Sequence, residues 1–397
     1  MLLTVSKRLE FSASRRLFIK EWSEAENLAA YGPETLARYG TGRNYVAYFI
    51  FSGEADRVTG MLMNISEIKE RVGRVLHDGF DHKSLNEDNP AFAHTVPTAE
   101  NVARQLFRDA QPLFQNGNAR LVACHLSESP DRSATFFADG TCEANYWFEF
   151  SAARQTVSPE LSDEENARLF GIAASPFGHG HNYRARLTFR EPDRSPKKIT
   201  DCLKSLQSEL DHKNLNREVP GLAQLPITTE TLARYLYRRA GETVGPHRVR
   251  LHERSDFFAE YWEGDRFYLG LQAPFGAAHC LNSEELSAEE NTALYGKCNN
   301  PRGHGHLYLT EATIGGTFDE RTGTIIGFDA FQAAVAGALA PWQNKHLDFE
   351  MEQFRGRPST GENIVHSLWP EFDSRLDQRL VRLRLWETAN NRFTLRK

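Results

Sequence analysis

Hydrophobic and polar residues alternate in several segments that are also rich in β-branched and aromatic side chains. Such alternation predicts strands with one buried face. The segments are 44–53, 119–128, 182–191, 247–255 and 379–388. Over 65–80 and 197–210, apolar residues instead recur at three-to-four spacing, which predicts two amphipathic helices.

A second kind of helix is predicted over 98–114 and 228–240. Each of these segments begins with Thr and has Glu two or three residues later, a signature of a helix N-terminus. The order along the chain is then two strands, two helices and two strands. This order predicts an α+β fold, an antiparallel sheet with helices on one face.

The chain repeats this order three times. A phrase beginning FSASRRL at Phe11 returns at Phe150 and Phe275, and each copy is followed by a charged helical phrase and a glycine pair. The phrase FDHKSLN returns as LDHKNLN and WQNKHLD, with its third residue at positions 82, 212 and 344. This period is far longer than that of a solenoid repeat, so each copy is expected to be a domain. We place the three units at 1–138, 139–263 and 264–397.

Composition narrows the class of protein. The 397 residues are 40% hydrophobic and 25% charged, and the net charge is −6. A globular protein is expected, and an extended nucleic-acid binder, which is normally basic, is not. The least polar window, 330–342, is too short to span a membrane, and the N-terminus lacks an apolar signal run. The five cysteines form no CxxC pair, which favours a reduced, cytoplasmic protein.

Candidate metal chemistry lies in the third unit. His304 and His306 flank a glycine, and residues two apart on a strand point to the same face. Strand pairing could bring His279 alongside them. Three neutral imidazoles with an open fourth position are typical of a catalytic zinc site. The alternative for the HxH pair alone is two ordinary surface histidines on a strand.

A thiol and two acid–imidazole pairs complete the candidate residues. Cys298 precedes the histidines, and a thiol beside a divalent cation has a depressed pKa and can act as a base or nucleophile. Its alternative role is that of a small buried apolar residue. Asp81–His82 and Asp211–His212 stand at helix ends, either as proton relays or as capping residues.

Through the phrases GKCNNPRGHGH, LDHKNLN and WETANN, the sequence resembles the 6-pyruvoyltetrahydropterin synthase family. The resemblance implies the tunnelling fold, or T-fold, whose subunits form trimers that stack into hexamers. Three fused units are then expected to close a pseudo-trimer within one chain, and two chains to form a homodimer that mimics the hexamer. The resemblance further implies zinc bound by three histidines, a catalytic thiol, Asp-His pairs supplied by another subunit, a Glu that anchors the pterin and a substrate-lining Thr and Glu. Those residues are His279, His304, His306, Cys298, Asp81, His82, Asp211, His212, Glu387, Thr360 and Glu362.

The other units depart from the family pattern. Unit one has Arg15, Thr41 and Arg43 in the histidine positions, and unit two has Arg154 before His179 and His181. A guanidinium does not ligate zinc, so neither unit is expected to bind it. Unit three has Gln343 and Asn344 in place of the Asp-His pair, so its site is expected to borrow a pair from another unit. Asp211–His212 is the first choice, because LDHKNLN is nearer the family phrase.

Three functions follow from the resemblance. The first is a zinc-dependent lyase that eliminates triphosphate from 7,8-dihydroneopterin triphosphate. It is favoured by the five residues between Cys298 and His304, a spacing that matches the 6-pyruvoyl enzymes. The second is a 6-carboxytetrahydropterin synthase of deazapurine synthesis. The third is a non-catalytic pterin-binding module.

Overall fold

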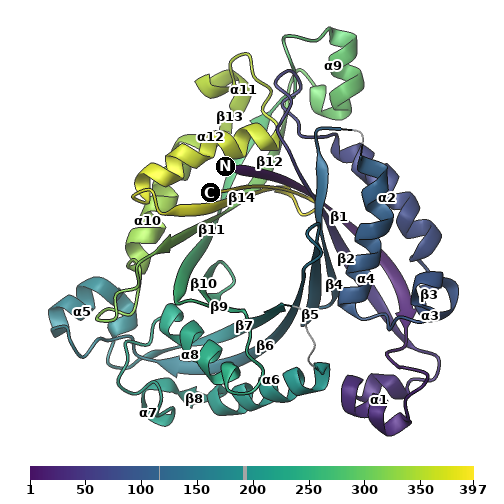
Figure 1. Ribbon diagram of the computed structural model, residues 1–397. Coiled ribbons are helices and arrows are strands. Elements are labelled where there is room, and N and C mark those ends of the chain that lie inside the picture. Colours follow the sequence, from purple (N-terminus) through teal and green to yellow (C-terminus); the bar gives the residue numbers. More distant parts are fainter. Residues whose placement is uncertain (116, 191–194) are drawn as a thin grey trace.

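The computed structural model describes residues 1–115, 117–190 and 195–397, so Glu191 of the predicted strand 182–191 lies outside the described residues. Within these residues, 15 strands form one sheet, and twelve of them close into an antiparallel barrel (Figure 1). Strand β10 (Phe257–Trp262) pairs with β11 (Arg266–His279), and β1 (Leu2–Arg15) pairs with β15 (Asn391–Arg396). The two chain termini therefore lie side by side.

Each unit contributes four neighbouring strands to the barrel. Closure leaves no free edge among these strands, which removes a template for aggregation. The remaining barrel strands are β2 (Thr41–Ser52), β4 (Arg120–Ser129), β5 (Arg132–Phe137), β6 (Cys142–Arg154), β7 (His179–Arg190), β9 (Arg248–Arg254), β12 (His304–Gly316) and β14 (Leu380–Thr388). Three two-residue strands pair in parallel with β1, β6 and β11, namely β3 (Lys83–Ser84), β8 (Lys213–Asn214) and β13 (Lys345–His346).

Two long helices of each unit cover the outside of the barrel (Figure 1). The helix predicted over 65–80 shows why, because its buried residues Ile68, Val72 and Leu76 form one stripe toward the sheet. The hydrophobic core thus lies between the barrel wall and its helices. The helices are α2 (Ile65–Gly79), α4 (Ala99–Ala110), α6 (Pro196–Leu210), α8 (Thr229–Gly241), α10 (Phe328–Leu339) and α12 (Gly361–Arg375).

Shorter helices complete each unit. The charged phrases form α1 (Glu24–Tyr31), α5 (Asp163–Phe170) and α9 (Ala288–Tyr295), and each helix begins with a Ser/Glu capping box. Single turns follow the short parallel strands, as α3 (Leu85–Asp88), α7 (Leu215–Glu218) and α11 (Leu347–Glu350). The 3-10 turns are η1 (Pro33–Leu36), η2 (Pro90–Phe92), η3 (Gln111–Phe114), η4 (Gly171–Ala174), η5 (Gly296–Asn299), η6 (Ala340–Trp342) and η7 (Glu352–Phe354). In the described parts of the chain, none of the helices combines the length and apolarity that crossing a bilayer requires.

Candidate functional site

Three histidines of unit three converge at one end of the β11–β12 pair. The register places His279 directly opposite His304, and His306 follows two residues along the same strand face. Their potential ligand atoms all lie within 4.8 Å of one another. His279 is fully buried, and its Nδ1 lies 3.0 Å from the carbonyl oxygen of Ser359. A carbonyl only accepts, so Nδ1 carries the proton and Nε2 is left as a free ligand atom.

This donor set fits a tetrahedral metal ion. The Nε2 atoms of His279 and His304 lie 3.1 Å apart. Two nitrogens bound at 2.0–2.1 Å to one tetrahedral ion are about 3.3 Å apart, close to this spacing. Among the described residues, His304 Nδ1 and His306 Nε2 are buried and have no hydrogen-bond partner. An ion bound by the Nε2 atoms of all three imidazoles would give His306 Nε2 the partner that it lacks.

Glu387 and Cys298 lie next to the histidines. Glu387 Oε1 is 3.9 Å from His279 Nε2 and 4.0 Å from His306 Nε2, and Asn391 Nδ2 donates to the other carboxylate oxygen at 3.2 Å. Cys298 stands in η5, where burial and then the negative charge of Glu387 raise the pKa of its thiol. The depressed pKa predicted from the sequence therefore requires a cation beyond these protein groups.

A cavity of about 230 Å³ opens beside this group, between units one and three. Unit three contributes Cys298, Glu387, Thr360 and Glu362, among others, as predicted for residues lining one site. Sequence reasoning missed the contribution of unit one, which includes two lysines and two methionines. These residues are Lys7, Lys69, Met61 and Met63.

The lysines give this cavity a positive side. Lys7 Nζ donates to Asn391 Oδ1 at 2.9 Å across the β1–β15 pair. Burial and then the positive charge of Lys69 lower the pKa of Lys7, whereas Glu387 raises it. The sequence carried no signal for Lys7, because this lysine reaches the cavity only when closure places the first strand of the chain beside the last.

Thr360 and Glu362 also join units three and one. Thr360 caps α12, and its hydroxyl donates to the carbonyl oxygen of Gly60 at 2.7 Å. Glu362 Oε1 accepts from the backbone N–H of Leu62 at 2.8 Å. Both side chains are buried, and burial raises the pKa of Glu362 to about 7. Gly60 has φ +69, and an added Cβ would lie 2.7 Å from Asn363, so this close approach requires glycine.

The same contact joins units two and three. The Thr228 hydroxyl donates to the carbonyl oxygen of Gly323, which has φ +71. Glu230 accepts from the hydroxyl of Thr324 and the backbone N–H of Ile325, and burial raises its pKa to about 7. The Thr-x-Glu signature, which predicted a helix start, therefore also forms hydrogen bonds to the neighbouring unit.

Comparisons with known proteins find one family, matched once in each of the three units. The family model described as 6-pyruvoyl tetrahydropterin synthase matches residues 4–139, 145–264 and 268–397. The chain belongs to this family. It is 34% identical over 132 residues to the 6-pyruvoyl tetrahydrobiopterin synthase of Drosophila melanogaster, which is 32% of this chain and 79% of that protein. It is 37% identical over 119 residues to the Homo sapiens enzyme of the same name, 30% of this chain and 82% of that protein.

The structure also aligns with the solved structure of Caenorhabditis elegans 6-pyruvoyl tetrahydropterin synthase. The alignment includes 33% of this chain and 94% of that chain, with 30% sequence identity and a TM-score of 0.32. Each of the two enzymes matches about one third of the chain, whereas the family model matches three times. The threefold repeat predicted from the sequence is confirmed, as is its membership of this family.

Arginines occupy the first histidine position of the two other units. Arg15 of unit one lies opposite Thr41, as His279 lies opposite His304. Its guanidinium pairs with Glu34 at 2.9 Å and with Glu128 at 3.0 Å. Glu128 lies near the end of β4 in unit one, as Glu387 lies near the end of β14 in unit three. In unit one, the guanidinium of Arg15 thus neutralises the carboxylate at the position that corresponds to Glu387.

Unit two has an intermediate arrangement. Arg154 pairs with Glu253, and His181 Nε2 lies 3.0 Å from the other oxygen of that carboxylate. Burial alone would raise the pKa of Glu253, but Arg154 and His181 together hold it well below its usual value. His179, His181 and Glu253 lie within 4.8 Å of one another, as metal ligands would. Because Arg154 stands in this group and would repel a cation, we keep the prediction that unit two binds no zinc.

The Asp-His pairs share one backbone geometry. His82, His212 and their counterpart Asn344 have φ values of 57°, 56° and 60°. This left-handed conformation is uncommon outside glycine, and Asn tolerates it best, so unit three retains the turn without the imidazole. The carboxylates of Asp81 and Asp211 each accept a backbone N–H of the first strand of their own unit, which lowers their pKa values.

Neither Asp-His pair reaches the cavity of Cys298 within one chain. The side chains of His82 and His212 are 84% and 83% exposed. His212 lies in a different cavity, together with His181 of its own unit. One chain therefore brings together the three histidines, Cys298 and Glu387, and leaves both acid–imidazole pairs facing outward.

Proposed function

We propose that this protein is a zinc-dependent lyase that eliminates triphosphate from 7,8-dihydroneopterin triphosphate and forms 6-pyruvoyltetrahydropterin. The observation that carries the proposal is the grouping of His279, His304 and His306 beside Cys298 and Glu387. The three units are T-folds that close as a pseudo-trimer, with the boundaries predicted from the sequence. Unit three retains the three histidines, the thiol and the glutamate of this set, and lacks the Asp-His pair.

His279, His304 and His306 would hold the zinc ion. When bound, zinc polarises the hydroxyl groups of the substrate side chain and acidifies the adjacent C–H bonds. Ser359 supports this role, because its carbonyl oxygen fixes the tautomer and the ring orientation of His279. The three ligands leave a fourth position for substrate, as in other catalytic zinc sites.

The remaining groups position the substrate and move protons. The carboxylate of Glu387 accepts hydrogen bonds from the ring N–H and amino groups of the pterin, which fixes its orientation. The Cys298 thiolate accepts a proton from a side-chain carbon of the substrate. Lys7 and Lys69 also line the cavity, and their positive charges suit the triphosphate that is released.

A second chain completes the site in this proposal. His82 and His212 are almost fully exposed, and a proton relay so placed can serve a thiol only across an interface. A homodimer, two pseudo-trimers stacked face to face, supplies that interface and mimics the family hexamer. A twofold dimer is also the commonest closed assembly. Light scattering is expected to give a mass of two chains.

The direct test is release of inorganic triphosphate from the substrate by the zinc-loaded protein. Cys298→Ser is expected to lower this rate by about a hundredfold or more while zinc content stays at one per chain, because the thiolate is removed and the ligands are not. The matched control is Cys202→Ser, at a half-buried cysteine of helix α6 outside the cavity. Unchanged turnover in Cys298→Ser would exclude the thiol as the base. If the wild-type protein showed no turnover, the result would favour the alternative function, a non-catalytic pterin-binding module.

A further inference from the structure

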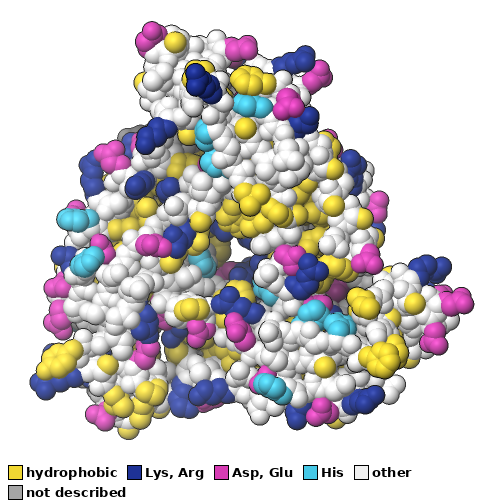
Figure 2. All heavy atoms as spheres, turned by 180° about the vertical axis from the view of Figure 1, so that it is seen from behind, with side chains coloured by type: hydrophobic (Ala, Val, Ile, Leu, Met, Phe, Trp, Pro, Cys, Tyr) yellow, Lys and Arg dark blue, Asp and Glu magenta, His cyan; other side chains and the backbone are white. Residues whose placement is uncertain are grey.

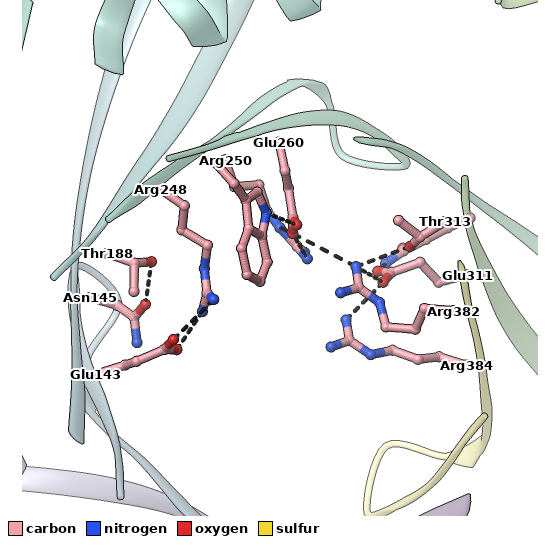
Figure 3. A network of polar contacts seen from close by, with 12 residues as sticks. Glu143, Asn145, Thr188, Arg248, Arg250, Glu260, Glu311, Thr313, Arg382 and Arg384 are labelled. Carbon is pink, nitrogen blue, oxygen red and sulfur yellow. Dashed lines mark hydrogen bonds and ion pairs between the residues drawn. The ribbon is translucent and has the colours of Figure 1, made fainter. Parts of the chain in front are cut away.

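Several arginine side chains point into the inside of the barrel. Arg248 and Arg250 of β9 and Arg382 and Arg384 of β14 point into the enclosed space (Figure 3). Three carboxylates accompany them. These are Glu143, Glu260 and Glu311, from β6, β10 and β12.

Strand register adds two more arginines to the same face. Arg186 of β7 lies directly opposite Arg250, and residues directly opposite in an antiparallel pair share a face. Arg392 of β15 stands two residues before Thr394, which lies opposite Arg384. We define the lumen cluster as six arginines and three glutamates, which are Arg186, Arg248, Arg250, Arg382, Arg384, Arg392, Glu143, Glu260 and Glu311.

Each glutamate is already paired. Glu143 accepts from Arg248 at 3.0 Å, Glu260 from Arg250 at 2.6 Å, and Glu311 from Arg384 at 2.7 Å. Among the described residues, neither Arg186 nor Arg392 forms an ion pair with a carboxylate. Three positive charges of the cluster therefore have no carboxylate to balance them.

The two unpaired arginines contact neutral side chains. The guanidinium of Arg186 lies 5.3 Å from the ring centre of Trp147, and its Nε is buried with no hydrogen-bond partner. Arg392 Nε donates to the hydroxyl of Ser6 at 3.0 Å. The donors that remain on both side chains form planar forks, and such forks match oxyanions.

Three of these guanidinium groups also influence one histidine of the barrel wall. Burial and then the charges of Arg392, Arg186 and Arg384 lower the pKa of His125 to about 3, so the imidazole is neutral and adds no charge. His125 Nδ1 lies 2.8 Å from the Thr135 hydroxyl on the same wall. Arginine cannot lose its proton, and enclosed unbalanced charge is unfavourable. An anion near His125 would remove this imbalance.

We propose that the barrel lumen binds a phosphate-type oxyanion among Arg186, Arg384 and Arg392. Figure 2 shows the molecule from behind hollowed near its middle, where charged side chains gather, so solvent ions have a route inward. None of the three arginines lines the cavity of Cys298, so the site is separate from the proposed catalytic centre. It does not depend on the proposed function.

The test measures binding of inorganic phosphate and pyrophosphate by calorimetry at constant ionic strength, with EDTA present to remove metal. We expect saturable binding of one anion per chain and a rise in the melting temperature that equal ionic strength of NaCl does not produce. Arg186→Gln removes a cation without leaving a carboxylate unpaired, and it is expected to weaken pyrophosphate binding about tenfold or more, the effect of about 1.4 kcal/mol. Arg392→Gln gives a second, independent variant with the same expectation.

Two controls separate the lumen from other surfaces. Arg108→Gln removes an exposed charge from helix α4 on the outside of the barrel, and His304→Ala disables the proposed metal site. Both variants are expected to bind pyrophosphate as the wild type does. The proposal is overturned if NaCl reproduces the stabilisation, if Arg186→Gln and Arg392→Gln bind normally, or if His304→Ala abolishes binding.

Discussion

The substitution Glu362→Gln replaces a buried carboxyl group, which can ionise, by an amide group, which cannot. This carboxyl group links unit three to unit one. The side chain is 2% exposed, and it accepts a hydrogen bond from Leu62 across the boundary between the units. Gln has nearly the same shape, keeps an acceptor oxygen and stays neutral at every pH. The variant therefore mimics the protonated glutamic acid.

The sign of the effect follows from proton binding. The pKa is about 7 in the folded protein and 4.5 in the unfolded chain. Between these values the folded state holds a proton that the unfolded state has lost, so wild-type stability falls as pH rises from about 4.5 to 7. The full cost above pH 7 is about 3 kcal/mol, at about 1.4 kcal/mol per tenfold change. For 397 residues unfolding together, this energy corresponds to about 4 °C in melting temperature.

Thermal unfolding of both proteins from pH 5 to pH 8 measures this difference. Glu362→Gln is expected to match the wild type near pH 5 and to melt about 4 °C higher at pH 8, since its burial costs no ionised charge. Glu230→Gln, at the matching contact between units two and three, is expected to behave alike, and Glu352→Gln, at an exposed carboxylate, to change nothing. A melting difference for Glu362→Gln that is constant with pH would refute the reasoning.

The other predictions concern the proposed catalytic site. His304→Ala is expected to abolish zinc binding measured by mass spectrometry, because two ligands hold zinc far more weakly than three, whereas His179→Ala keeps one zinc per chain. His212→Ala is expected to lower turnover about a hundredfold with zinc retained, and His82→Ala is expected to stay near the wild-type rate. The reverse result would assign the proton relay to unit one. If both variants remained active, an Asp-His relay would be excluded. Lys69→Met is expected to raise KM for the triphosphate substrate about tenfold with kcat little changed, and an unchanged KM would place the phosphates elsewhere.

Features set by local spacing could be predicted from the sequence. The alternating segments became the barrel strands, and the apolar stripe of 65–80 became α2 with a boundary shift of one residue. The convergence of His279 with His304 was also predictable, because both lie on neighbouring strands of one unit whose register is shared by all three units. Repetition supplied the alignment that a single unit would have lacked.

Closure was expected from the family resemblance, but the individual contacts that it creates could not be predicted. Thr360 and Gly60 are 300 residues apart, and only the closed barrel brings them together. Lys7 reaches the cavity of unit three for the same reason. The alternating arginines of β9 and β14 were visible in the sequence as polar strand faces, but their common position inside the barrel depends on which strands of different units become neighbours.

The central claim is that unit three performs triphosphate elimination to a 6-pyruvoyl product. Its most direct test is to incubate the zinc-loaded protein with 7,8-dihydroneopterin triphosphate and to identify the pterin formed by liquid chromatography and mass spectrometry. We predict 6-pyruvoyltetrahydropterin together with inorganic triphosphate, and neither product when His304→Ala is used. Formation of 6-carboxytetrahydropterin, or recovery of unchanged substrate, would contradict the claim.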